Sequence, residues 1–419
     1  MGRWEDNSRV MNLEDPIGII ELDNINIKCL IFKINNNNDS KILSTSTTPS
    51  EGIHNDVVVN VAKASNAIRL CISEAEKKAK ISLKKINVIF EQPDFLCTKF
   101  SKHKKIGGSK IHRDDIEFLL KEAKKQIVLN DKNQSIIHIF NHNYIVDGKT
   151  FVEEPMGVYA DSFTHEITFI TAPKNNLKNI NQVFIDCDLE IERLISRTFT
   201  LGAKLLSNKE LQFGSALINL GFEKISLGLF KNLALVHSIT LPIGINHITK
   251  DIAKVCSLNL NESEIIKNSI DFSFQNNQNL FDKNNYLKNT YFINSNFRKI
   301  SKNLILDVIK ARLDEIFAIL KKQLIVPGFN FNSGINLLLV GEGSDLFNLE
   351  KYCTNFFGQN VKTIDNNNVE KDEYLEKNFM PSLGALKIIQ DGWETEAIPE
   401  MREKNIKKIG FFGKIFGNY

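Results

Sequence analysis

The apolar positions near the start of the chain predict a hairpin followed by a helix and a strand. Residues 17–32 form an apolar run rich in β-branched side chains, and Asp23 and Asn24 interrupt it, as expected for two strands joined by a turn. Residues 57–79 then carry apolar side chains at helical spacing, and residues 85–90 are a short apolar strand. This order predicts a unit of mixed α/β structure.

The rest of the chain repeats this order, with strands before helices. A second hairpin is expected to begin near residue 213, and two halves that each open in this way suggest an internal duplication. Further strands are predicted at residues 135–146, 165–172, 215–232, 233–244 and 335–343, and further helices at residues 113–127, 176–187, 247–255, 262–269, 301–324 and 381–390. Loops are predicted at residues 35–39, 101–110, 271–296 (Asn-rich, or short strands) and 365–377. The predicted fold class is α/β with two similar lobes.

Residues 404–419 have the pattern of an amphipathic helix. At about 100° per residue the apolar side chains fall on one face and the lysines on the other, which is typical of a helix that lies on a membrane surface. Gly410, Gly413 and Gly417 each lower helix stability by about 1 kcal/mol relative to Ala, so the helix is expected to form on contact. A helix that docks into a groove of this protein or of a partner fits the same pattern. The predicted membrane-binding residues are Ile406, Lys407, Lys408, Ile409, Phe411, Phe412, Lys414, Ile415 and Phe416.

The composition is that of an ordinary globular protein. The 419 residues are enough for two or more domains, and 42% are hydrophobic and 25% charged. A net charge of +3 gives no argument for nucleic-acid binding. The chain lacks both an apolar run of about 20 residues and the apolar core of a signal peptide, so a cytoplasmic location is expected. The six scattered cysteines have no CxxC spacing, which predicts buried free thiols.

Candidate catalytic or metal-binding residues are few. His138 and His142 lie four residues apart on a predicted strand, with no carboxylate or cysteine at a metal-binding spacing, so structural roles are expected. No Ser/His/Asp or Cys/His set stands out.

Several motifs resemble those of FtsA, a family of bacterial cell-division proteins related to actin and attached to the membrane. The most specific are LPIGINHITKDIA at residues 241–253, followed by NESEIIK at residues 261–267, and the long segment at residues 144–173. The helix IKARLDEIF, the strand and turn LLLVGEGSDL and the basic tail follow in family order. The resemblance implies two actin-like lobes with a nucleotide cleft, and an FtsA-type subdomain 1C inserted in the first lobe. It also implies filament formation and a C-terminal membrane anchor.

The resemblance divides the chain into subdomains. The implied order is an N-terminal tail (1–16), lobe 1 core (17–84), subdomain 1C (85–173), lobe 1 core continued (174–211), lobe 2 core (212–249), subdomain 2B (250–303), lobe 2 core continued (304–380), a return helix to lobe 1 (381–390), a linker (391–403) and the membrane-targeting helix (404–419).

The implied cofactor is ATP with Mg²⁺, held by two hairpin turns. The first turn pattern falls on Glu21, Leu22, Asp23 and Asn24, and Asp23 stands where glycine is expected. The second falls on residues 219–226, where one of three glycines remains. The cofactor-binding residues that the family positions imply are Glu21, Gly221, Glu264, Lys267, Gly341 and Gly343.

These departures predict a weakened phosphate site. A carboxylate about 4 Å from a phosphate charge costs about 4 kcal/mol at an effective dielectric constant of about 20, and Asp23 and Glu223 each introduce such a charge. Weak or absent ATP binding is therefore expected, and hydrolysis is not.

The function implied is that of an adaptor at the division septum, on the cytoplasmic face of the cell membrane. Its implied partners are the C-terminal peptide of the tubulin-like protein FtsZ, held by residues 250–303, other copies of the chain, other division proteins and the membrane surface; no nucleic acid is implied. Two alternatives share the fold: an ATP-dependent phosphotransferase or ATPase, and a pilus-assembly adaptor that binds a peptide of an integral membrane partner. The first needs an intact phosphate cleft, and the second does not need the tail.

Overall fold

The structure is a computed structural model with two compact units. It describes residues 15–391, apart from residues 36–37, 152–154, 275–276, 293–298, 326–334, 359 and 365–372. Unit 1 contains Met1–Ser207, Asn232–Val236 and Val369–Tyr419, and unit 2 contains Asn208–Lys231 and His237–Asn368. The amphipathic pattern at residues 404–419 lies outside the described residues.

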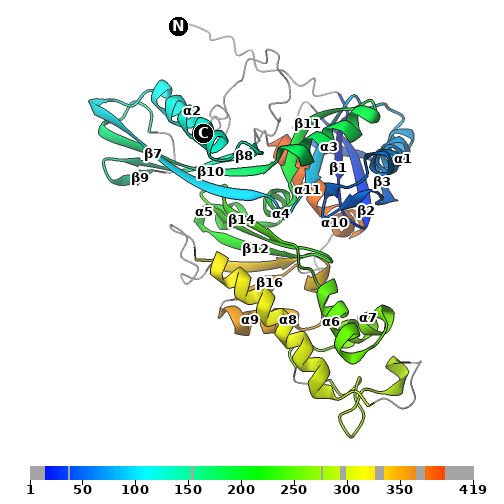
Figure 1. Cartoon of the computed structure of the whole chain (residues 1–419). Helices are drawn as coiled ribbons and strands as arrows, with labels where there is room; N and C mark the ends of the chain where they lie inside the picture. Colours follow the sequence, from blue (N-terminus) through cyan, green and yellow to red (C-terminus); the bar gives the residue numbers. More distant parts are fainter. Residues whose placement is uncertain are drawn as a thin grey trace. The chain divides into compact units, whose positions relative to one another are not determined.

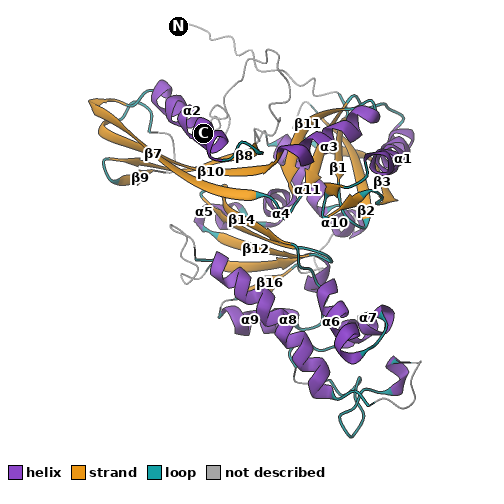
Figure 2. Cartoon of the chain, in the orientation of Figure 1, coloured by secondary structure: helices purple, strands orange, loops and turns teal. Residues whose placement is uncertain are grey.

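Unit 1 is built around a five-stranded mixed sheet (Figures 1 and 2). The strands, in spatial order, are β11 (Glu190–Ser196), β6 (Lys85–Phe90), β1 (Ile17–Glu21), β2 (Asn26–Ile34) and β3 (Ser40–Pro49). β1 pairs antiparallel with β2 and parallel with β6, which in turn pairs parallel with β11. The predicted hairpin at residues 17–32 is confirmed, but β3 was missed because its Ser- and Thr-rich sequence carries little apolar periodicity.

Two pairs of helices pack on this sheet. α1 (Val61–Ala79) packs with α3 (Lys174–Asp186), and α4 (Arg197–Leu205) packs with α11 (Met380–Gln390). Both pairs contact the sheet, and α11 contacts its central strands. α1 starts four residues later than predicted because Val57–Val58 pairs with Ile53–His54 as strands β5 and β4. Asn60 then caps the helix by accepting a hydrogen bond from Lys63 N at 3.0 Å.

A second sheet of unit 1 occupies the segment between β6 and α3. Its spatial order is β7 (Leu96–Lys110), β10 (Tyr159–Pro173), β8 (Gln134–Val146) and β9 (Lys149–Phe151), and α2 (Arg113–Asn130) packs on it. Residues 101–110 were predicted to be a loop, and this is wrong: they belong to β7, which pairs with β10 along most of its length. Lysines are common on such edge strands because they discourage pairing with other chains.

Unit 2 contains most of the other five-stranded sheet, apart from the first three residues of β14, and most of the remaining helices. Its spatial order is β14 (Ala234–Leu241), β13 (Ile225–Lys231), β12 (Ser215–Leu220), β15 (Asn336–Val340) and β16 (Val361–Thr363). The helices are α5 (Asn208–Phe213), α6 (Asn246–Cys256), α7 (Leu260–Ser269), α8 (Lys302–Gln323) and α9 (Leu349–Phe357). α6 packs against both α7 and α8. The predicted single strand at residues 215–232 is two strands, β12 and β13, separated by a turn.

The two five-stranded sheets share one plan, which confirms the predicted duplication. In each, a hairpin (β1 and β2, or β12 and β13) is extended by a third strand beside its second strand and by two parallel strands beside its first. The family subdomain boundaries given above remain predictions.

Three smaller predictions can be compared with the described residues. The predicted loop at 365–377 contains helix α10 (Glu373–Asn378) in its described part. The Asn-rich segment contains the short 3₁₀ helix η1 (Asn289–Tyr291) and isolated bridges. All six cysteines are free, as predicted, but only four of them are buried, because Cys97 and Cys187 are partly exposed. Among the described residues, no helix is both long and apolar enough to cross a membrane.

Candidate functional site

The first hairpin turn lies where three parallel strands of unit 1 end. Glu21 is the last residue of β1, Glu91 follows β6, and Arg197 follows β11. Because neighbouring parallel strands have their carboxyl ends at one edge of a sheet, these three residues converge although they are far apart in sequence. Asp56, in the turn between β4 and β5, completes the group.

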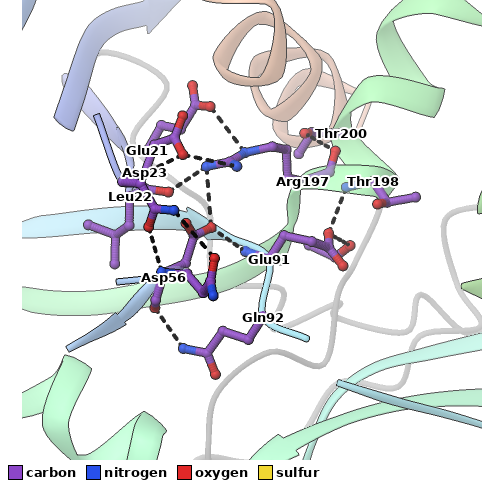
Figure 3. Close-up of polar contacts among 12 residues, drawn as sticks. Glu21, Leu22, Asp23, Asp56, Glu91, Gln92, Arg197, Thr198 and Thr200 are labelled. Carbon is purple, nitrogen blue, oxygen red and sulfur yellow. Dashed lines mark hydrogen bonds and ion pairs between the residues drawn. The ribbon is translucent and has the colours of Figure 1, made fainter. Parts of the chain in front are cut away.

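Arg197 lies at the centre of this group, which we call the Arg197 cluster (Glu21, Asp23, Asp56, Glu91 and Arg197; Figure 3). Its Nε is 3.1 Å from Glu21 Oε1, its Nη1 is 3.7 Å from Asp23 Oδ1, and its Nη2 is 3.3 Å from Asp56 Oδ2. Nη2 also donates a hydrogen bond to the carbonyl oxygen of Leu22. One guanidinium therefore joins both sides of the hairpin turn to the neighbouring β4–β5 turn.

Glu91 anchors the other side of the cluster. Its Oε2 accepts hydrogen bonds from Ser196 Oγ and Thr198 N, both at 2.8 Å, and its own N–H donates to Asp56 Oδ2 at 2.7 Å. The Glu91 carboxylate thus lies at the N-terminus of α4, where the helix dipole stabilises negative charge.

Burial and charge shift the pKa values in opposite directions here. Burial raises the pKa of the Glu21 carboxyl above its ordinary value, and Arg197 offsets part of this effect. Burial also lowers the pKa of the Arg197 guanidinium, but the surrounding carboxylates, Asp56 first among them, outweigh this and raise it above its ordinary value. Arg197 is therefore a permanent cation.

Three glycines lie near the second hairpin turn, between β12 and β13 in unit 2. Neighbouring atoms leave no room for a side chain at any of them. A Cβ on Gly221 would lie 2.6 Å from the Lys224 carbonyl oxygen, and one on Gly343 would lie 2.7 Å from Leu220 Cβ. Gly341 has φ +85°, and a Cβ there would overlap Asn219 Oδ1. Three predicted site residues, Gly221, Gly341 and Gly343, are therefore gathered around the end of β12.

Glu223, in this turn, is already engaged by α6. Asn246 Nδ2 donates to Glu223 Oε1 at 2.7 Å, and Lys250 Nζ lies 3.2 Å from Glu223 Oε2. The carboxylate that we expected to oppose phosphate is thus partly neutralised within unit 2, as Asp23 is by Arg197 in unit 1. The estimated cost of about 4 kcal/mol per carboxylate therefore overstates the repulsion.

The other two predicted ligand residues bind each other. Lys267 Nζ lies 2.8 Å from both carboxylate oxygens of Glu264, and Thr249 Oγ1 donates to Glu264 Oε2 at 2.5 Å. The Lys267 side chain is fully buried. The hydrogen bonds from Lys267 and Thr249 outweigh burial and lower the pKa of the Glu264 carboxyl. The role of this pair as adenosine ligands remains a prediction.

The sequence pattern singled out two members of the Arg197 cluster, Glu21 and Asp23, both in the first turn pattern. Asp56, Glu91 and Arg197 were missed, although Glu91 and Arg197 each come directly after an apolar strand. A charged residue directly after a buried strand was the sequence feature that could have identified Glu91 and Arg197.

Comparisons with known proteins agree with this architecture. A family model described as "SHS2 domain inserted in FTSA" matches residues 96–171, which cover the β7, β8, β9 and β10 sheet with α2. A second model, described as "Cell division protein FtsA", matches residues 216–384. Together the two models cover more than half of the chain.

The chain belongs to the FtsA family. FtsA of Neisseria meningitidis is 22% identical over 350 residues, which cover 83% of this chain and 83% of that protein. FtsA of Agrobacterium fabrum is 20% identical over 356 residues, covering 83% of this chain and 80% of that protein. The chain is therefore similar to cell division proteins over most of its length.

Solved structures confirm the actin-like fold, and the family model for residues 96–171 confirms the inserted FtsA-type subdomain. The PilM–PilN type IV pilus biogenesis complex matches with a TM-score of 0.60 and 15% identity, covering 89% of this chain and 98% of that one. MreB5 of Spiroplasma citri bound to ADP matches with a TM-score of 0.51 and 13% identity, covering 91% and 98%. At these identities the likeness concerns the fold alone.

The actin-like fold suggests nucleotide binding for the FtsA family, but the carboxylates of the first hairpin turn in unit 1 are already paired with a cation of the chain. Over the described part of the chain, no group of three or more His, Cys, Asp or Glu side chains is placed to hold a metal ion. The carboxylates of the first hairpin turn surround Arg197 instead.

Proposed function

We propose that this FtsA-family protein is a membrane-bound adaptor of cell division, which links the FtsZ ring to the cytoplasmic face of the cell membrane and assembles with other copies of itself. It works by binding and not by turnover. Family membership supports the role in cell division. The observation that carries the adaptor role is the amphipathic pattern of residues 404–419, which combines an apolar face with a lysine-rich one.

The position of α11 supports a tail that leaves from unit 1. α11 ends at Gln390 and packs against α4 and the central strands of the first sheet. Residues 391–403 carry several carboxylates, whereas the lysines are concentrated beyond residue 403. The acidic segment would stay in solvent while the lysines meet anionic lipids, where each contributes about 1 kcal/mol.

Removing the tail is expected to abolish membrane binding. In flotation with liposomes of anionic lipid, the full chain should float, and a chain ending at Glu400 should stay in the bottom fraction. Phe412→Glu should lower the membrane partition constant at least about tenfold, because it replaces an apolar side chain whose full burial contributes about 1.5–3 kcal/mol. Phe412→Leu is the matched control, and it should float like the wild type. Equal flotation of all four chains would exclude the anchor.

Exposed apolar side chains mark the part of unit 2 where we propose that the FtsZ peptide binds. Val255, Leu260, Ile265 and Leu304, on α6, α7 and α8, are all exposed to solvent. α6 packs against both other helices. Exposed apolar side chains on neighbouring helices are suited to bind a short peptide.

Ile265→Asp is expected to weaken binding of the FtsZ C-terminal peptide about 30-fold. This corresponds to a loss of about 2 kcal/mol of binding free energy, as for an important interface residue. Fluorescence anisotropy with a labelled peptide from the same organism measures this change. Leu70→Asp is the matched control, because Leu70 is 62% exposed on α1 of unit 1 and Ile265 is 55% exposed. An unchanged affinity at Ile265 would argue against this surface.

The two alternatives receive less support. A phosphotransferase or ATPase needs a phosphate site with Mg²⁺, and the Arg197 cluster does not fit that ion. A pilus adaptor is favoured only by the likeness to the PilM–PilN complex, which is limited to the fold. ATP therefore has no catalytic role in the proposed function.

A further inference from the structure

The carboxylates of the Arg197 cluster are buried together with a cation of the chain itself. Arg197 is 5% exposed, and Glu21, Asp56 and Glu91 are 2%, 0% and 1% exposed. Buried carboxylates destabilise a fold unless positive charge and hydrogen-bond donors compensate them. In unit 1 the guanidinium supplies the charge at Glu21 and Asp56, and Ser196 and Thr198 supply donors at Glu91.

Each of the three guanidinium nitrogens lies at ion-pair distance from a carboxylate, although Nε and Glu21 Oε2 make no hydrogen bond among the described residues. Nε faces Glu21, Nη1 faces Asp23, and Nη2 faces Asp56 and the Leu22 carbonyl. Since the planar guanidinium is always protonated and holds its donors in a fixed fork, it links these carboxylates as a bound metal ion would. A divalent cation among the same carboxylates would have to displace this permanent positive charge.

Two backbone N–H groups of the first hairpin turn are also engaged. A turn that binds phosphate offers free N–H groups to the anion. Here Leu22 N donates to the Ile89 carbonyl oxygen at 2.9 Å, and Asn24 N donates to Asp23 Oδ1 at 2.8 Å. The carboxylate of Asp23 therefore takes the position of an external anion at Asn24 and is itself 3.7 Å from Arg197.

We propose that Arg197 is a built-in cation that replaces Mg²⁺ in unit 1, so that the first hairpin turn is held in its folded form without a metal ion. Three observations support this assignment: the charge compensation of the buried carboxylates, the three ion pairs of the guanidinium, and the engaged amides of Leu22 and Asn24. Unit 1 then neither requires Mg²⁺ nor gains stability from it.

Metal binding to the full-length protein tests the proposal directly. In an Mn²⁺ titration followed by electron paramagnetic resonance, the wild type should bind no Mn²⁺ at stoichiometric concentrations, and millimolar Mg²⁺ should leave the unfolding temperature unchanged. Stoichiometric Mn²⁺ binding that Glu21→Gln removes would overturn the proposal. This measurement needs no change at Arg197, so it holds even where an Arg197 variant fails to fold.

A pair of substitutions tests whether Arg197 is the counter-ion. Arg197→Met should lower the unfolding temperature by about 10 °C, because it leaves buried carboxylates uncompensated. Asp56→Asn should lower it in the wild type but raise it in the Arg197→Met background, since there it removes an uncompensated charge. Arg312→Met is the matched control: Arg312 pairs with Asp251 at 2.6 Å in a partly exposed position, and its loss should cost much less. Equal effects of Asp56→Asn in both backgrounds would contradict the counter-ion role.

Discussion

Gly384→Ala is expected to destabilise unit 1 by about 3 kcal/mol, although the same change inside a helix normally stabilises by about 1 kcal/mol. Gly384 lies within α11, and a Cβ there would lie 2.6 Å from the Thr200 carbonyl carbon and overlap the carbonyl oxygen. The clash is with the backbone of α4, so no side-chain rotation relieves it. Thermal unfolding followed by circular dichroism should show a midpoint lowered by roughly 6–12 °C.

Gly18→Ala is the control for this prediction. A Cβ on Gly18 would lie 2.5 Å from Leu83 Cδ1, the end of a flexible side chain that can move. Its effect should therefore be clearly smaller than that of Gly384→Ala. A stabilised Gly384→Ala protein would show that α4 and α11 do not approach as closely as the structure has them.

The stability of the protein is expected to fall on acidification because of His138. This side chain is fully buried on β8, and its Nε2 accepts a hydrogen bond from Ser196 N at 2.9 Å. Burial lowers the pKa of His138 to about 3 from 6.5. Between these values only the unfolded chain takes up the proton, so falling pH favours unfolding. From about pH 8 to about pH 5 the free energy of unfolding falls by about 2 kcal/mol, and it falls further until the pH reaches the pKa of His138 in the folded state.

Urea unfolding at a series of pH values measures this effect. His138→Gln removes the titrating group and should flatten the pH dependence by about 2 kcal/mol over the same range, at the cost of lower stability near neutral pH. His103→Gln, on the exposed strand β7, is the matched control and should keep the wild-type slope. Equal slopes for the wild type and His138→Gln would contradict the role of His138.

Part of the candidate site could be predicted because hairpin turns are local. Asp23 and Asn24 interrupt an apolar run, and the structure has its turn there. Gly221, Gly341 and Gly343 were found through family positions, and the structure brings them together at the end of β12. Sequence alone did not reveal that Glu264 and Lys267 pair with each other.

The remaining errors come from contacts between distant segments. The lysine-rich residues 101–110 have the composition of a loop, and only their pairing with β10 makes them a strand. The sequence around Asp56, Glu91 and Arg197 does not indicate that these charged residues interact. Their interaction follows from the short distances between them in the folded chain.

Most helices and strands, the repeated order of the two sheets and the family could be predicted from the amino-acid sequence, because periodicity, turn residues and motifs are properties of short segments. The amphipathic pattern of residues 404–419 is also visible there. The compensation of the first hairpin turn's carboxylates by Arg197, in contrast, became visible with the folded chain. The physical reason is that a charge is stabilised by the partners folding places a few ångströms away, and β1, β6 and β11 bring theirs from distant parts of the chain.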